Sequence, residues 1–186
     1  MSDPRLGATN ASFPPPTETV PKGSSSLNVS DSGIAFIKEK ESFVGHLYND
    51  DAGHCTIGYG HLVHLGECDG SLSEAEFKSG ITKADAAALA AVNLVKYVDA
   101  VRLSVDVELT QFEFDALVSF TYNLGTGILP GSSLLTHVNN GEWGLVMGSF
   151  MQYVKARNPK TKKLEFNQGL ANRRAEEGKL FLYGTY

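Results

Sequence analysis

The sequence predicts an α+β fold, in which a small antiparallel β subdomain near the front of the chain precedes a larger helical lobe. Residues 45–64 are rich in Gly, aromatic and β-branched residues and carry turn signals, whereas helical periodicity dominates after them. The chain has 186 residues, of which 42% are hydrophobic and 20% charged, so one domain can bury a core of its own.

Residues 1–30 differ from the rest in composition. They are rich in Pro, Ser, Thr and Gly, including Pro14-Pro15-Pro16, and can bury little apolar surface. We therefore expect a flexible tail or linker before a globular domain of residues 31–186. Such a tail suits a fragment of a longer protein as well as an ordinary disordered N-terminus. No apolar stretch follows a basic start, so we expect no signal peptide and synthesis in the cytoplasm.

Capping and turn residues predict where the first helix and the first strands of the globular part begin and end. Ser32 can cap a short helix that ends near Ser42. The turn signal Asn49-Asp50-Asp51 divides the next stretch into a hairpin or a three-stranded meander.

Helices are predicted along the remainder of the chain. Ser73 with Glu76, and Thr110 with Glu113, have the spacing of a capping box at a helix start. The segment 84–101 is Ala-rich, periodic and free of Gly and Pro, which predicts the longest helix. The other helix signals are the stops at Gly125 and Gly141 and a final periodic stretch over residues 168–182.

Composition argues against several classes of function. No stretch approaches the roughly 18 apolar residues of a membrane span, so we expect no membrane insertion. The formal net charge is −5 and no basic patch stands out, which argues against a nucleic-acid partner. No Gly-rich phosphate loop follows a strand, so nucleotide binding is unsupported, and we expect a monomer without a cofactor.

Two acidic residues stand at the junction of the first helix and the sheet. On a helical wheel Glu41 projects between Ile34 and Ile37, and it lies near the helix C-terminus. Both features favour the protonated carboxyl that a general acid needs. Asp50 lies in the predicted turn, and Thr56 begins the next strand. Two carboxylates beside a cleft would suit a glycosidase, although an Asp in a turn commonly serves only the turn.

These residues resemble a known family. The series Glu41-x8-Asp50-x5-Thr56 resembles the Glu, Asp, Thr catalytic triad of the phage-type lysozymes, family 24 of the glycoside hydrolases, and the stretch 45–61 around Asp50 and Thr56 matches that family too. Two further stretches resemble the family's central core helix and its C-terminal helix, residues 110–125 and 169–181. The resemblance covers residues 32–183, and three motifs in the right order make it specific.

The resemblance implies a two-lobed α+β lysozyme-like fold with a cleft between the lobes. It also implies hydrolysis of the β-1,4 bond between N-acetylmuramic acid and N-acetylglucosamine in bacterial peptidoglycan. Glu41 would be the general acid. Asp50 and Thr56 would hold the attacking water on the opposite face of the sugar, which gives inversion.

Five further residues are expected to support the site. Arg173 matches a family arginine that pairs with the catalytic glutamate, although a surface ion pair is the alternative. Asn123 matches a residue that bonds substrate, or else caps a helix end. Ser132 and Ser133 would line the cleft or cap the following helix. His61 is expected to make a structural hydrogen bond near the cleft.

Cys55 and Cys68 allow a disulfide, two free thiols or half of a metal site. His61 and His64 lie between them, but the spacings do not match those of familiar zinc fingers. We favour a disulfide and predict no metal, because the target compartment is oxidising.

The sequence therefore favours a peptidoglycan hydrolase that acts in the periplasm or cell wall of a bacterium. It leaves open whether the chain is a phage endolysin or a lysozyme domain of an interbacterial toxin, whose partners would include an immunity protein and a secretion machine. It also leaves open transglycosylase chemistry, a catalytically silent wall-binding module and a zinc-dependent interaction module.

Overall fold

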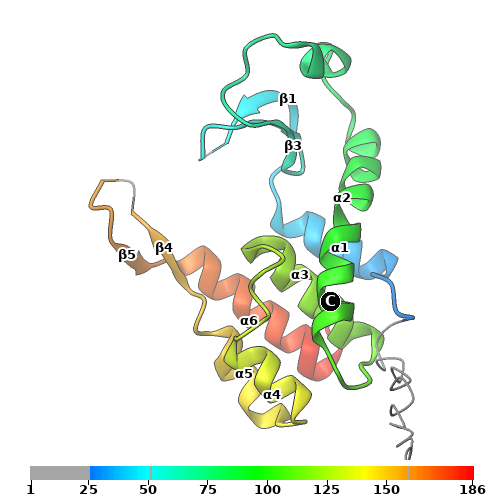
Figure 1. Ribbon diagram of the computed structural model, residues 1–186, viewed down its shortest axis with the longest axis vertical. Helices are drawn as coiled ribbons and strands as arrows, with labels where there is room; N and C mark the ends of the chain where they lie inside the picture. Colours follow the sequence, from blue (N-terminus) through cyan, green and yellow to red (C-terminus); the bar gives the residue numbers. More distant parts are fainter. Residues whose placement is uncertain (1–25, 51, 159) are drawn as a thin grey trace, which may run out of the picture.

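The computed structural model describes residues 26–50, 52–158 and 160–186, and it arranges them as two lobes connected by a long helix (Figure 1). The predicted α+β architecture is confirmed, with a small sheet-containing lobe and a larger helical one. The predicted flexible tail lies, up to residue 25, outside the described residues. In the described ranges no helix is both long enough and apolar enough to cross a bilayer.

The small lobe is a three-stranded antiparallel meander, as residues 45–64 predicted. Its strands β1 (Val44–Asn49), β2 (Cys55–Gly58) and β3 (His61–His64) pair in the order β1-β2-β3. Thr56, in the central strand, is paired with Tyr48 on one side and Leu62 on the other. The central strand is buried along its whole length, which fixes the register because a slip of one residue would reverse its faces.

A 3-10 helix, η1 (Leu72–Phe77), follows the sheet, and here the sequence prediction was wrong. The predicted capping box at Ser73 does not form, and the N-cap residue Ser71 makes no side-chain capping bond. Instead, the buried carboxylate of Glu74 accepts hydrogen bonds from the backbone N–H groups of Asp69 at 2.7 Å and Gly70 at 2.9 Å. These bonds hold the chain in a tight turn and leave no room for a regular α-helical start.

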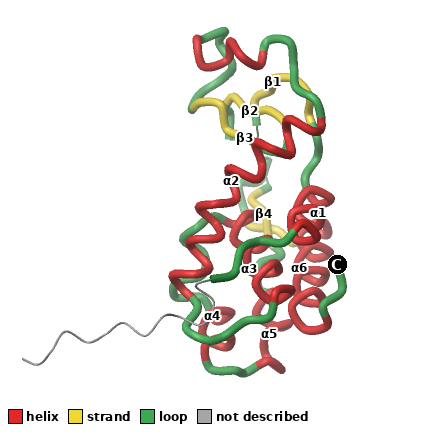
Figure 2. The backbone as a smooth tube through the Cα atoms, turned by 90° about the vertical axis from the view of Figure 1, so that its right-hand side faces the viewer, coloured by secondary structure: helices red, strands yellow, loops and turns green. Residues whose placement is uncertain are grey.

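The long helix α2 (Lys83–Ser104) connects the two lobes (Figure 2). It contains the predicted segment 84–101. Its start is set by Thr82, whose side chain forms a capping box with Asp85. Because one unbroken helix spans both lobes, α2 defines their separation and one wall of the space between them.

The helical lobe is built around α3 (Gln111–Leu124), which packs against α1 (Asp31–Lys40), α2 and α6 (Gln168–Tyr183) (Figure 1). The predicted capping box of Thr110 with Glu113 is present, and Gly125 ends the helix with a positive φ of 96°. Five apolar side chains of α3 are fully buried: Phe114, Ala116, Leu117, Val118 and Phe120. Beyond these helices, α5 (Trp143–Phe150) packs against α6, and α4 (Ser133–Asn139) packs against α5.

The first helix begins at a different cap from the one predicted. Ser30, rather than Ser32, caps α1, because its Oγ accepts a hydrogen bond from the N–H of Gly33 at 3.0 Å. Leu27 and Val29 also pack against the core. The packed part of the chain therefore begins a few residues before the predicted boundary at residue 31.

A second sheet, the hairpin of β4 (Lys155–Arg157) and β5 (Leu164–Phe166), was not predicted. It precedes α6 and projects away from the helical lobe (Figure 1). Its two strands have three residues each, too few for a period-2 pattern to stand out in the sequence.

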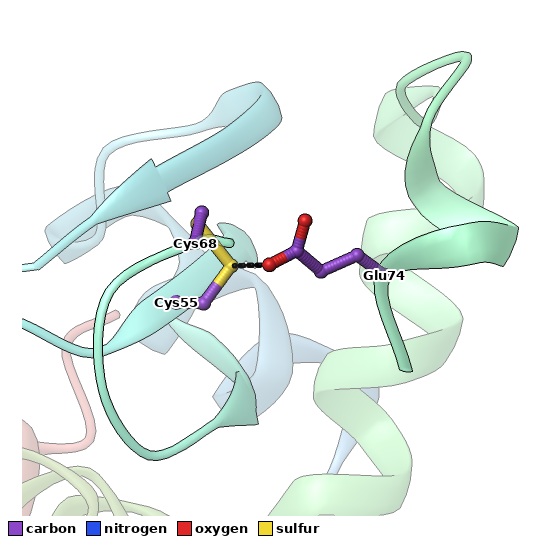
Figure 3. Close-up of side chains that lie close together, drawn as sticks. All are labelled: Cys55, Cys68 and Glu74. Carbon is purple, nitrogen blue, oxygen red and sulfur yellow. Dashed lines mark hydrogen bonds between the residues drawn. A yellow bond between two sulfur atoms is a disulfide. The ribbon is translucent and has the colours of Figure 1, made fainter. Parts of the chain in front are cut away.

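The disulfide between Cys55 and Cys68 is present, with the two Cα atoms 4.7 Å apart (Figure 3). Oε1 of Glu74 lies 3.5 Å from Sγ of Cys55 and 2.9 Å from Nε2 of His64. The contact with Glu74 raises the pKa of His64, and the same contact lowers the pKa of Glu74. The loop after β3 is thus held against the sheet by the Cys55–Cys68 disulfide and by the hydrogen bond between Glu74 and His64.

We expect the disulfide to stabilise the small lobe by limiting the freedom of the unfolded chain. Replacing both Cys55 and Cys68 by Ser should lower the free energy of unfolding by on the order of 3 kcal/mol, the value for a loop of roughly 15 residues. Denaturant unfolding of the variant and the oxidised wild type measures this difference. Two reactive thiols in the unfolded, unreduced wild type would contradict the bridge.

Candidate active site

A cleft of about 480 Å³ lies between the lobes and contains both predicted carboxylates, Glu41 and Asp50. Glu41 comes from the end of α1 and Asp50 from the turn after β1, so the two lobes contribute one each. Asn123, at the end of α3, also lines this cleft, as predicted.

Glu41 is the residue that ends α1, and its backbone is already extended, with φ −105° and ψ 133°. Its side chain is 26% exposed, and Oε1 accepts a hydrogen bond from Nη1 of Arg173 at 2.7 Å. The predicted pairing of Arg173 with Glu41 is therefore present. Oε2 accepts no hydrogen bond from any residue in the described ranges, so this oxygen is available to a ligand.

Asp50 is held by hydrogen bonds from its own turn. Oδ1 accepts from the backbone N–H groups of Ala52 and His54, both at 2.9 Å. The N–H of His54 is the main reason that the pKa of Asp50 lies below its ordinary value of 3.8. The side chain is therefore an anion at neutral pH, with its position set by the backbone.

Thr56 lies behind Asp50 and is 2% exposed. Its Oγ1 donates to Oδ2 of Asp50 at 3.4 Å and to the carbonyl oxygen of His54 at 3.1 Å. Glu41 and Asp50 thus face the cleft directly, whereas the third predicted residue contacts it through Asp50.

A buried ionic cluster on α6 supports this arrangement. The carboxylate of Glu177 is fully buried and lies 3.1 Å from Nε of Arg173 and 2.9 Å from Nε of Arg174. Burial raises the pKa of Glu177, and the two guanidinium groups oppose that shift. Arg174 in turn donates to Oδ1 of Asn123 at 2.9 Å. Arg173 was expected from the sequence, but no role was predicted for Arg174 or Glu177, because their contacts with α3, to Asn123 and Ser119, join residues that are distant in the chain.

Several residues of the cleft were missed from the sequence. Tyr97 and Tyr122 line it with rings 5.0 Å apart, and the hydroxyl of Tyr122 donates to the carbonyl oxygen of Tyr59 at 2.8 Å. Burial raises the pKa of Tyr122, which keeps that hydroxyl a donor. The other missed lining residues include His54 and Lys96. The α2 residues at 93, 96 and 97 face one way at helical spacing, but no local signal identifies that face as a cleft wall.

Two predicted residues lie elsewhere. Ser132 caps α4, because its Oγ accepts from the N–H of Leu135 at 3.0 Å, and Ser133 donates to Gln152 at 3.1 Å. Neither is among the lining residues of the cleft, and the capping alternative was correct for Ser132, whereas Ser133 is the first residue of α4. His61 makes the expected structural hydrogen bond beside the cleft, since its Nδ1 accepts from Asn93 at 2.9 Å.

In the described part of the chain one group with metal-binding spacing includes a histidine. The ligand atoms of His64, Asp69 and Glu74 lie within 4.8 Å of one another. Both oxygens of Glu74 already accept hydrogen bonds there, and the two cysteines are joined to each other. The group lies outside the cleft and has no part in the chemistry considered below.

The model of the phage lysozyme family matches residues 38–177, three quarters of the chain. The chain belongs to the phage lysozyme family. It is 35% identical over 161 residues to the endolysin of Bacillus phage PZA, covering 86% of this chain but 57% of that endolysin. The chain thus spans little more than half the length of that relative. The predicted class, a lysozyme-type glycoside hydrolase, is confirmed at the level of the family.

Solved structures agree with this membership in the phage lysozyme family. The endolysin from Escherichia coli O157:H7 phage FAHEc1 has a TM-score of 0.74 at 30% identity and covers 87% of this chain and 97% of its own. The muramidase domain of SpmX from Asticaccaulis excentricus has a TM-score of 0.70 at 30% identity and covers 83% and 97%. The two-lobed lysozyme-like fold predicted from the motifs is therefore confirmed.

We expect Glu177→Gln to lower the free energy of unfolding by about 3–5 kcal/mol, because it leaves two buried guanidinium groups without their carboxylate. Chemical denaturation monitored by circular dichroism measures the loss. The neighbouring Glu176→Gln is the matched control, since Glu176 is 46% exposed and pairs with Lys40 at the surface. That control should cost about 1 kcal/mol or less. Equal effects of the two substitutions would contradict a central role for Glu177.

Proposed function

We propose that this phage lysozyme domain is a muramidase, which hydrolyses the β-1,4 bond between N-acetylmuramic acid and N-acetylglucosamine in bacterial peptidoglycan. The observation that carries the proposal is one cleft containing Glu41 and Asp50, with Asp50 contacted by Thr56. Membership in the phage lysozyme family supports it, as does the similarity to a muramidase domain.

In this proposal Glu41 is the general acid. Arg173 holds Oε1, so Oε2 is the oxygen that can face the substrate and give its proton to the leaving glycosidic oxygen. The guanidinium also fixes the side chain at the rim of the helical lobe. A proton donor must be held in place relative to the leaving oxygen, since small misplacements are costly to the rate.

Asp50 and Thr56 would hold the attacking water on the opposite face of the sugar. Asp50 is ionised and accepts hydrogen bonds through Oδ1 from its own turn, so Oδ2 is the oxygen beside Thr56 that can orient a water. Attack from the face opposite the acid inverts the anomeric carbon. Tyr97 and Tyr122 provide aromatic surface along the cleft on which a sugar ring can pack.

We place the activity in phage-mediated lysis of the host cell wall, because the similar proteins named above include phage endolysins. A lysozyme domain of an interbacterial toxin is the alternative, and it would require an immunity protein and a delivery machine. A silent wall-binding module with this fold would keep the cleft but not the chemistry. Loss of turbidity of a peptidoglycan suspension distinguishes the last possibility.

We expect Glu41→Gln to reduce lysis of purified peptidoglycan to a few per cent of wild type or less, because it keeps the shape of the side chain and removes the proton donor. Turbidity loss measures lysis, and thermal unfolding shows whether the fold is retained. Glu39→Gln is the matched control, since Glu39 lies two residues away and is 74% exposed. Substantial lysis by Glu41→Gln would exclude this residue as the acid.

We expect the initial product to have the α-anomeric configuration, inverted from the β-1,4 bond, which proton NMR of a freshly digested soluble fragment measures. Asp50→Asn should reduce the rate severely, since the amide cannot accept the proton of the water. Mass spectrometry of the digest should find reducing ends. A retained β configuration or 1,6-anhydro sugars would contradict the water-activating role of Asp50 and Thr56.

A further inference from the structure

The β4–β5 hairpin concentrates positive charge in an otherwise acidic protein. Five of the chain's 16 basic residues fall within residues 155–166, against one acidic residue, although the whole chain has a net charge of −5. They are Lys155, Arg157, Lys160, Lys162 and Lys163, and all five are exposed. The expectation that the chain has no basic patch was therefore wrong at this segment.

The pairing of the strands collects two charges and two apolar side chains on one face. Lys155 is paired with Phe166 and Arg157 with Leu164. Side chains directly opposite in an antiparallel pair lie on the same face, so these four form one surface, which we call the basic-apolar face. Leu164 is 65% exposed and Phe166 is 62% exposed.

The other face of the hairpin turns toward the protein. Ala156, which belongs to that face, lines a second pocket together with Asn123 and Arg173. Because successive side chains of a strand alternate, the basic-apolar face points away from this pocket. It therefore presents its charges and apolar groups outward, and the hairpin as a whole projects from the helical lobe, below the small lobe in the view of Figure 1.

The charges of the hairpin are not compensated locally. Within the described ranges none of its four lysines forms an ion pair. The acidic residue, Glu165, instead accepts hydrogen bonds from Asn158 at 2.7 Å and Thr161 at 2.6 Å. Arg157 donates to the carbonyl oxygen of Lys162 at 2.8 Å, which closes the turn and keeps a charge on the face. These cations are thus available to an external anionic partner.

We propose that the basic-apolar face binds the surface of a bilayer that contains anionic phospholipids, without crossing it. Lys and Arg would meet the phosphates, while Phe166 and Leu164 enter the boundary between headgroups and acyl chains. A wall glycan could stack on the ring of Phe166, but it offers no comparable partner to the aliphatic Leu164. Binding of this kind would hold the cleft at the border between membrane and wall.

Co-sedimentation with vesicles tests the proposal, using the full chain. One set of vesicles contains equal parts of phosphatidylglycerol and phosphatidylcholine, and the other contains phosphatidylcholine alone. Lys155→Gln with Arg157→Gln removes charge, and Leu164→Ser with Phe166→Ser removes apolar surface. The matched control is Leu72→Ser with Lys78→Gln, an exposed apolar and basic pair in and beside η1.

Wild type and control should bind the anionic vesicles and should lose this binding in high salt. Each basic residue near an anionic bilayer contributes about fivefold in affinity, so the double charge variant should bind about twenty-five-fold more weakly. The apolar variant should also bind more weakly. Hydrolysis of a soluble glycan fragment should be unchanged in both, which shows that the cleft is intact and separates this test from that of the proposed activity.

Equal binding to the two sets of vesicles, or unchanged binding by both hairpin variants, would overturn the proposal. A parallel measurement uses purified peptidoglycan sacculi and Glu41→Gln protein, which does not digest them. If the hairpin substitutions abolish binding to sacculi and leave binding to vesicles unaltered, the face belongs to the wall polymer and the membrane assignment is wrong.

Discussion

The carboxylate of Glu177 is the group on which the helical side of the cleft depends. It is fully buried and lies between the guanidinium groups of Arg173 and Arg174, and it also accepts a hydrogen bond from Ser119 at 2.8 Å. Each arginine then extends from this anchor to one residue of the cleft. Arg173 reaches Glu41 and Arg174 reaches Asn123. The position of the proposed acid is therefore determined from inside the core.

Burying such a cluster costs free energy, because each charge loses its hydration and the ion pairs recover only part of that desolvation penalty. A hydrophobic substitute could pack as well, but it could not direct two side chains toward the cleft. Helical spacing makes the arrangement possible. Residues 173, 174 and 177 share one face of α6, and residues 119 and 123 share the facing side of α3. The cluster thus orients Glu41 and Asn123, which an apolar core of the same volume would not do.

Features with local causes could be predicted from the sequence, whereas features with distant causes could not. The capping box at Thr110 and the stop at Gly125 depend on a few neighbouring residues, and both were predicted. Ser73 failed as a cap because of Glu74, whose hydrogen bonds reach back to the preceding loop. Tyr97 was missed because its place on the cleft depends on where α2 lies relative to the sheet. Glu41, Asp50 and Thr56 were found through the family resemblance, and their roles stay predictions.

The two carboxylates of the cleft, Asp50 and Glu41, are fixed by different kinds of contact, each within its own lobe. Asp50 is held within six residues of chain by its own turn and by Thr56, so it moves with the small lobe. Glu41 is held through Arg173 by the core of the helical lobe. Their separation therefore depends on contacts that cross between lobes, such as the hydrogen bond from Tyr122 to Tyr59 and the continuous helix α2. A site divided in this way fixes each carboxylate within its own lobe, so the gap between them that a glycan must fit is set by the contacts between the lobes.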